Sequence, residues 1–154
     1  MTTVMDYLQW RGDLRFSQDP FNDIDAMVLA MLSYLPLWDI VPGGDSNEAT
    51  TIQQTAERLL EKDQPNPKEP DATRQARIPG VEEGIFQLLV AAGESIRFRD
   101  IRISRFEHKT DFTIGQQFAA LTYTLPDAWH HKVIAFRGTD NTLIGWKEDF
   151  EMAY

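Results

Sequence analysis

The spacing of apolar residues predicts a firm helix near the start of the chain. Between Asn22 and Leu35 they recur every three or four positions, as on one face of an amphipathic helix: Ile24, Met27, Val28, Met31, Leu32 and Leu35. The Asn22 side chain can cap the free N–H groups of the first turn, and Pro36 would stop the helix. This segment is therefore expected to be a helix with one buried face.

Three further helices are expected. A short one covers 7–10, and a second runs over 48–62 with Ile52, Ala56, Leu59 and Leu60 on one face. In a third, Val81, Ile85, Leu88, Leu89 and Ala92 share a face, and Gly93 suits its C-cap. The segment 63–79 between the last two contains four prolines and almost no large apolar residue, which predicts a mobile loop.

Strands are expected after Gly93. Apolar and basic residues alternate over 96–99 and again over 101–103, which predicts one strand with a bulge or two short strands. A strand over 118–125, a loop at Pro126-Asp127 and a strand over 132–136 form a hairpin. The last strand, with Val133 and Ile134, is apolar at successive positions and is expected to be buried on both faces.

The alternation also raises a question about four arginines on one predicted face: Arg97, Arg99, Arg102 and Arg105. They would bind phosphate or lipid headgroups if they formed a basic stripe. A solvated strand face is the simpler interpretation, because each is separated from the next by apolar residues.

The last strand leads into a turn and a further helix. Gly138 allows a sharp change of direction, and Asp140, Asn141 and Thr142 are residue types that cap helices. Apolar residues follow at helical spacing, at Leu143, Trp146, Phe150 and Ala153. Strand, glycine turn and helix is an arrangement that places backbone N–H groups at the end of a strand, where α/β folds bind ligands.

At these residues the chain resembles a known family. The run Ala135-Phe136-Arg137-Gly138-Thr139, followed by Trp146 and Asp149, resembles the class 3 lipase motif, in which Phe-Arg-Gly-Ser/Thr precedes Trp-x-x-Asp. The two ends of the chain resemble a group of poorly characterised bacterial lipase-like α/β-hydrolases. The implied fold class is α/β: residues 1–154 would be a single incomplete domain, the N-terminal part of a lipase-like α/β-hydrolase fold.

The resemblance implies roles for particular residues. Thr139 would supply oxyanion-hole donors through its backbone N–H and hydroxyl, and Gly138 would shape the turn. Residues of the next segment would form a lid or contact the substrate, as in the lipases that the motif resembles: Asn141, Leu143, Ile144 and Trp146. The implied substrate of the complete protein is a small ester or a lipid, with no cofactor.

The nucleophile of such enzymes is missing from the sequence. Their serine lies in Gly-x-Ser-x-Gly, and none of the serines here has glycines at both positions: Ser17, Ser33, Ser46, Ser95 and Ser104. We therefore expect the N-terminal part of a serine hydrolase, inactive as it stands and prone to self-association through an uncovered sheet edge. The alternative is a non-catalytic hydrolase-like binding or assembly module.

Composition and charge exclude other functions. The net charge of −9 argues against nucleic acid and anionic membranes as main partners. The chain has no cysteine, no secretory signal and no apolar run long enough to span a bilayer, which predicts a cytoplasmic protein. Adjacent His130 and His131 are expected to be loop residues rather than metal ligands. Tyr7, Trp10, Met27 and Met31 are expected to pack in the core rather than to line an acyl-chain tunnel.

Overall fold

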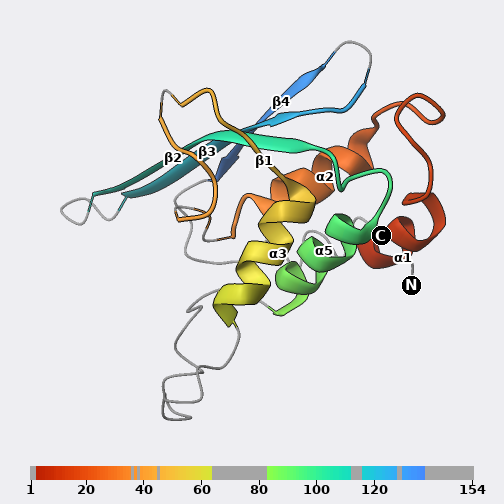
Figure 1. Ribbon diagram of the computed structural model, residues 1–154, viewed down its shortest axis with the longest axis horizontal. Helices are drawn as coiled ribbons and strands as arrows, with labels where there is room; N and C mark the ends of the chain where they lie inside the picture. The colour runs from red at the N-terminus through yellow and green to blue at the C-terminus, as the bar shows by residue number, and fades with distance from the viewer. Residues whose placement is uncertain are drawn as a thin grey trace.

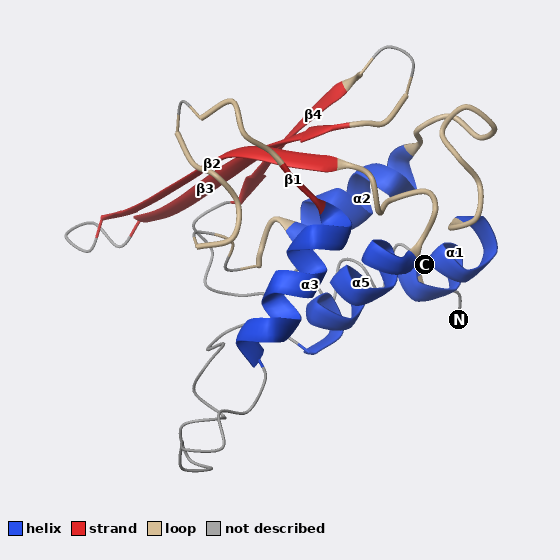
Figure 2. Ribbon diagram, viewed as in Figure 1, coloured by secondary structure: helices blue, strands red, loops and turns tan. Residues whose placement is uncertain are grey.

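The computed structural model describes residues 3–35, 37, 39–44, 46–63, 83–111, 116–127 and 130–137. In these residues the chain is a mixed α/β structure with four helices and a four-stranded antiparallel sheet. The elements run in the order α1 (Val4–Arg11), α2 (Asp23–Leu32), β1 (Thr50–Thr51), α3 (Ile52–Asp63), α5 (Glu83–Glu94), β2 (Arg102–Asp111), β3 (Gln116–Thr124) and β4 (Lys132–Arg137). The predicted class, helices first and then a hairpin, is confirmed at this level (Figures 1 and 2).

The first two helices begin at capping boxes. Thr3 accepts a hydrogen bond from the Asp6 backbone N–H, and Asp6 accepts one from the Thr3 backbone N–H. Asn22 and Asp25 form the same reciprocal pair at the start of α2. These bonds satisfy N–H groups that have no partner within the helix, which explains why α2 begins directly after Asn22, as predicted.

Helix α3 starts at Ile52, the first residue of its apolar stripe, and not near residue 48 as predicted. Thr50 and Thr51 form β1 and pair with Ile103 and Arg102 of β2. The Ile52 backbone N–H then donates to the Ile101 carbonyl at 2.9 Å, so the chain leaves the sheet directly into α3. A strand of two residues carries no periodicity, which is why the predicted start near residue 48 was too early.

Gly93 does not cap α5 as predicted, because α5 continues to Glu94. A Cβ atom at this position would lie 3.0 Å from the Ala56 Cβ and 3.5 Å from the Gln53 Cα. The glycine therefore permits α3 and α5 to approach closely, and the two helices lie side by side in Figure 1.

The sheet has the strand order β1-β2-β3-β4, with every neighbouring pair antiparallel. The register between β2 and β3 shifts between Ser104 and Glu107, where Arg105 has a φ of 53°. The bulge predicted at Asp100 is wrong, and the irregularity in β2 between Ser104 and Glu107 was not predicted. Residues 95–100 form turns instead of the predicted strand over 96–99.

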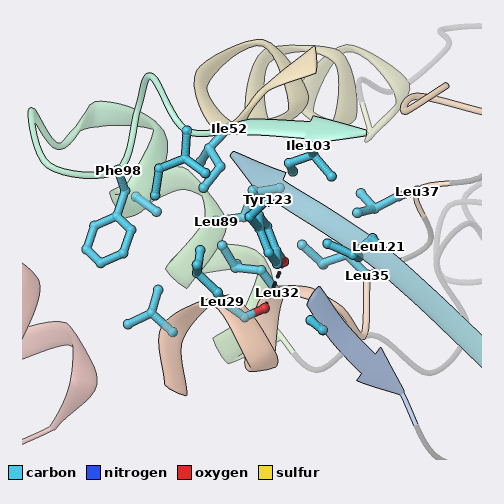
Figure 3. Packing of buried hydrophobic residues seen from close by; sticks show 14 of the residues in the cluster. Leu29, Leu32, Leu35, Leu37, Ile52, Leu89, Phe98, Ile103, Leu121 and Tyr123 are labelled. Carbon is cyan, nitrogen blue, oxygen red and sulfur yellow. Dashed lines mark hydrogen bonds between the residues drawn. The ribbon is translucent and has the colours of Figure 1, made fainter. Parts of the chain in front are cut away.

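The helices cover one face of the sheet and bury a continuous apolar core. Tyr123 of β3 is fully buried and points from the sheet toward α2, where its hydroxyl donates to the Leu29 carbonyl at 2.7 Å (Figure 3). Leucines of α2 and of the segment after it belong to the same buried cluster, at Leu29, Leu32, Leu35 and Leu37. Helix α5 contributes Leu88 and Leu89 to this cluster.

The prediction that the last strand is buried on both faces is wrong. Ala135 is buried and Val133 packs against the core, but Ile134 and Phe136 are 59% and 65% exposed. Side chains alternate between the faces of a strand, and α2 lies against only one of them. β4 is thus a one-sided strand at the edge of the described sheet.

The segment predicted to be a mobile loop, 63–79, lies outside the described residues except for Asp63, which ends α3. Among the described helices, none has the length and apolar character needed to cross a bilayer.

Candidate functional site

The candidate site lies at the end of β4. The predicted site residues, Gly138, Thr139, Asn141, Leu143, Ile144 and Trp146, all lie outside the described residues. The structure does describe the support immediately before them, because β4 ends at Arg137 and Gly138 is the next residue. Backbone pairing with β3 and a contact of the Arg137 side chain hold this end of β4.

Backbone pairing fixes this strand end on one side. Residues of β3 pair with the last residues of β4, Ala120 with Phe136 and Ala119 with Arg137. The pairing continues without a register shift to Lys132 at the other end of β4. An unbroken ladder determines the direction in which the chain leaves the sheet, and a turn that follows such a strand is positioned better than one in a long loop.

A second contact involves the Arg137 side chain. Its guanidinium lies 5.8 Å from the centroid of the Tyr34 ring, within the range of a cation–π interaction. Tyr34 follows α2, so this contact joins the strand end to the helix layer. An ion pair between Arg137 and Asp149 stays a prediction, since Asp149 lies outside the described residues.

Tyr123 holds β3, the strand beside β4, on α2. Burial raises the pKa of its hydroxyl far above the usual value, so the group stays protonated and keeps its bond to Leu29. Tyr123 pairs with Val133 in the neighbouring strand. Its role is to hold the sheet on α2, and it takes no part in proton transfer at neutral pH.

The largest departure from the sequence prediction is Arg97. This residue is fully buried and does not lie on a solvated strand face. Its Nε donates to Asp25 Oδ1 at 2.9 Å and its Nη2 donates to Asp25 Oδ2 at 2.5 Å. Asp25 is fully buried as well, so the two charges compensate each other inside the protein.

The rest of the guanidinium is also satisfied. Nη1 donates to the carbonyls of Leu14 and Asp19, at 3.0 and 2.8 Å, and Nη2 donates to that of Pro20 at 3.2 Å. The Phe16 ring lies 4.2 Å from the guanidinium carbon. Burial by itself would lower the pKa of Arg97, but the hydrogen bond and the charge of Asp25 outweigh it and raise the pKa, so the side chain stays charged.

This cluster organises the N-terminal segment and is remote from the end of β4 in sequence. Tyr7 donates to Asp25 Oδ1 at 2.9 Å, and Asn22 donates to the Tyr7 hydroxyl at 2.9 Å. Sequence reasoning missed the cluster because its members are far apart in the chain. The one local signal was the capping pair Asn22 and Asp25, which does not indicate a distant arginine.

Burial differs among the four residues that were expected to pack in the core: Tyr7, Trp10, Met27 and Met31. Met31 packs against the core as expected, whereas Met27 is only half-buried. Tyr7 is half-buried with its hydroxyl bonded to Asp25. Trp10 is 65% exposed, so core packing was the wrong expectation for it.

The two histidines lie where the hairpin enters β4. The His131 ring Nδ1 and the Asp127 Oδ2 are 2.5 Å apart, and the His131 backbone N–H donates to Asp127 Oδ1 at 3.0 Å. Burial alone would raise the pKa of Asp127, but these hydrogen bonds outweigh it and lower the pKa. Within the described ranges, no cluster of three or more His, Asp or Glu side chains is arranged to hold a metal ion.

Comparison with known protein families gives one match. Residues 92–154 match the family model described as Mbeg1-like, a lipase-like family. The match covers β2, β3, β4 and the predicted turn, but less than half of the chain. No curated protein and no solved structure matches the chain.

These comparisons correct the resemblance drawn from the sequence. The motif around Arg137, Gly138 and Thr139 was taken as that of a class 3 lipase, and that assignment is wrong: the matching model is Mbeg1-like, and no homologue or structure supports class 3. What remains is the match of residues 92–154 to one lipase-like family model.

Proposed function

We propose that this chain forms the oxyanion side of a lipase-like serine hydrolase that acts on carboxylic esters, within an α/β-hydrolase fold. The observation that carries the proposal is the position of β4, a firmly paired strand that ends at Arg137, directly before Gly138 and Thr139. The Mbeg1-like match supports it because the matched residues include this strand and the turn.

In this proposal Thr139 binds the oxyanion through its backbone N–H and its hydroxyl. Acyl transfer places negative charge on the carbonyl oxygen of the ester, and one preorganised donor lowers the barrier by about 3–4 kcal/mol. Gly138 gives the turn its shape. Asn141, Leu143, Ile144 and Trp146 contact the acyl part of the substrate or form a lid over it.

The remaining catalytic groups would come from residues outside these 154. A nucleophilic serine in Gly-x-Ser-x-Gly, followed by Asp and His, would attack the carbonyl carbon, with His as the general base. The reaction needs no cofactor. A chain without cysteine suits the reducing cytoplasm, where we place the protein.

Kinetics on the complete product of the encoding gene test the role of Thr139. With p-nitrophenyl butyrate as substrate, Thr139→Val should lower kcat by about 10²–10³-fold, because it removes the hydroxyl donor. Thr139→Ser keeps the hydroxyl and should retain most of the activity. Both variants should unfold at the wild-type temperature, and an unchanged kcat in Thr139→Val would remove Thr139 from the oxyanion hole.

A second candidate is a non-catalytic hydrolase-like binding or assembly module. The observation in its favour is that none of the five serines of this sequence lies in Gly-x-Ser-x-Gly. For either candidate, β4 at the edge of the described sheet leads us to expect self-association of the 154-residue chain. Sedimentation equilibrium measures this directly, and a strictly monomeric chain would contradict it.

A further inference from the structure

A groove runs between α1 and the end of α5, on a part of the molecule that the proposed ester site does not use. Its volume is about 420 Å³, within the range of small-molecule sites. Four apolar residues are among those that line it, Met5, Leu8, Ala91 and Ile96, and we call these four its floor. Ile96 is 38% exposed, so a large apolar side chain faces solvent here.

The two sides of the groove are fixed relative to each other. The Arg97 backbone N–H donates to the Gly12 carbonyl at 2.9 Å, which joins the end of α1 to the turn after α5. Within that turn the Phe98 N–H donates to Ser95 Oγ at 3.0 Å, and the Arg97 side chain is anchored by Asp25. The groove is therefore preformed, and a ligand would not have to order it.

Two acidic residues also line the groove, and we call these two its rim. Asp13 and Glu94 are both exposed, and neither forms an ion pair with any residue in the described part of the chain. None of the residues that line the groove is basic. An apolar floor beneath two uncompensated carboxylates complements a ligand that is apolar at one end and cationic at the other.

We propose that this groove binds a small organic ammonium ion with an apolar chain. The chain lies on the floor against Leu8 and Ile96, and the ammonium group lies at the rim with Asp13 and Glu94. A metal ion would make no use of the apolar floor, and a fatty acid anion would be repelled by the rim. A protein partner would need about 800 Å² of surface, more than a groove beside an eight-residue helix offers.

Titration of the whole chain with n-hexylammonium, followed by ¹H–¹⁵N NMR, tests the site. We expect saturable shifts at the amides of Gly12, Asp13, Glu94 and Ser95. Hexan-1-ol has the same chain without the charge and should bind about five- to tenfold more weakly, because each exposed ion pair contributes up to about 1 kcal/mol. Hexanoate should give no saturable shift, and added salt should weaken hexylammonium alone.

Substitutions separate a specific rim from the overall negative charge. Asp13→Asn with Glu94→Gln should reduce hexylammonium binding to the level of hexan-1-ol. The matched control, Glu57→Gln with Glu61→Gln, removes the same charge from the exposed face of α3 and should leave binding unchanged. Equal binding of hexylammonium and hexan-1-ol, an equal effect of both double substitutions, or shifts that never saturate would each overturn the proposal.

Discussion

Replacing Arg97 with Met should destabilise the protein more than any surface change, because it leaves Asp25 charged and buried without its partner. Both side chains have no solvent exposure. Removing one partner of a buried ion pair costs about 3–5 kcal/mol. The carbonyls of Leu14, Asp19 and Pro20 lose their donors as well. Since small domains are stable by only about 5–15 kcal/mol, the loss should be evident in a urea titration followed by circular dichroism.

The sharper test changes Asp25 in two backgrounds. In the wild type, Asp25→Leu should lower the free energy of unfolding, because it leaves the Arg97 charge buried and uncompensated. In Arg97→Met the same substitution should raise it, because it removes the orphaned carboxylate; a buried pair can be replaced by apolar groups at little cost. The three carbonyls would still lack donors, and the Tyr7 hydroxyl and the Asn22 N–H would lose their acceptor, so recovery should be partial.

A cost of less than about 1 kcal/mol for Arg97→Met, the scale of an exposed ion pair, would contradict a buried pair between Arg97 and Asp25. An equal loss of stability on Asp25→Leu in both backgrounds would contradict coupling between them, since the effects of independent sites add and those of coupled sites do not. Arg97→Lys is a useful intermediate. It keeps the charge but lacks the planar fork that reaches Asp25 and the carbonyls together, so it should fall between wild type and Met.

Three further predictions concern packing and pH. Gly93→Ala should lower the free energy of unfolding measured in urea by about 1–3 kcal/mol, because the new Cβ would lie 3.0 Å from that of Ala56. Gly84 lies in the same helix, but a Cβ there would meet no neighbouring group within 4 Å, so Gly84→Ala should raise this free energy by about 0.5–1 kcal/mol. Equal effects of the two substitutions would refute the close crossing of α3 and α5. Tyr123→Phe should cost about 0.5–1.5 kcal/mol, because it removes one buried hydrogen bond while the Leu29 carbonyl keeps its bond from the Ser33 N–H, and an unchanged urea midpoint would contradict that. The pKa of Asp127 is lowered on folding, so the stability that this carboxylate contributes is complete above its unfolded pKa of about 4 and is lost as the pH falls through the folded value. Measured by ¹³C NMR, the pKa of Asp127 should rise in His131→Ala. An unchanged pKa would exclude His131 as the cause of the lowering.

Local patterns in the sequence were enough to predict the helices and the hairpin. The apolar stripe from Ile24 to Leu32 and the cap at Asn22 are both local, and α2 follows them closely. The loop at Pro126-Asp127 separates β3 from β4 as expected. Each of these features depends on residues within a few positions of one another.

The errors arose where distant residues decide the structure. The alternation over 96–99 looked like a strand, but Arg97 finds its partner Asp25 seventy-two positions earlier, and the segment becomes a turn. Gly93 looked like a cap, but its role is set by Ala56 of α3. The apolar run at Val133 and Ile134 indicated a strand correctly but not which of its faces is covered, because that depends on where α2 packs.

For the candidate site, the sequence predicted more than the described structure tests. It predicted a strand over 132–136, and β4 covers Lys132–Arg137. The roles of Gly138 and Thr139 stay predictions, because both residues lie outside the described part of the chain. The assignment to class 3 lipases was wrong, and the match that exists is to the Mbeg1-like family model over residues 92–154.

Labelling of the complete gene product with a fluorophosphonate probe tests directly whether the protein is a serine hydrolase. We expect a covalent adduct on one serine in a Gly-x-Ser-x-Gly sequence beyond residue 154. Labelling should be much slower in Thr139→Val, because the probe's reaction also develops charge in the oxyanion hole. A folded complete product that the probe never labels would contradict catalysis and leave the binding or assembly module.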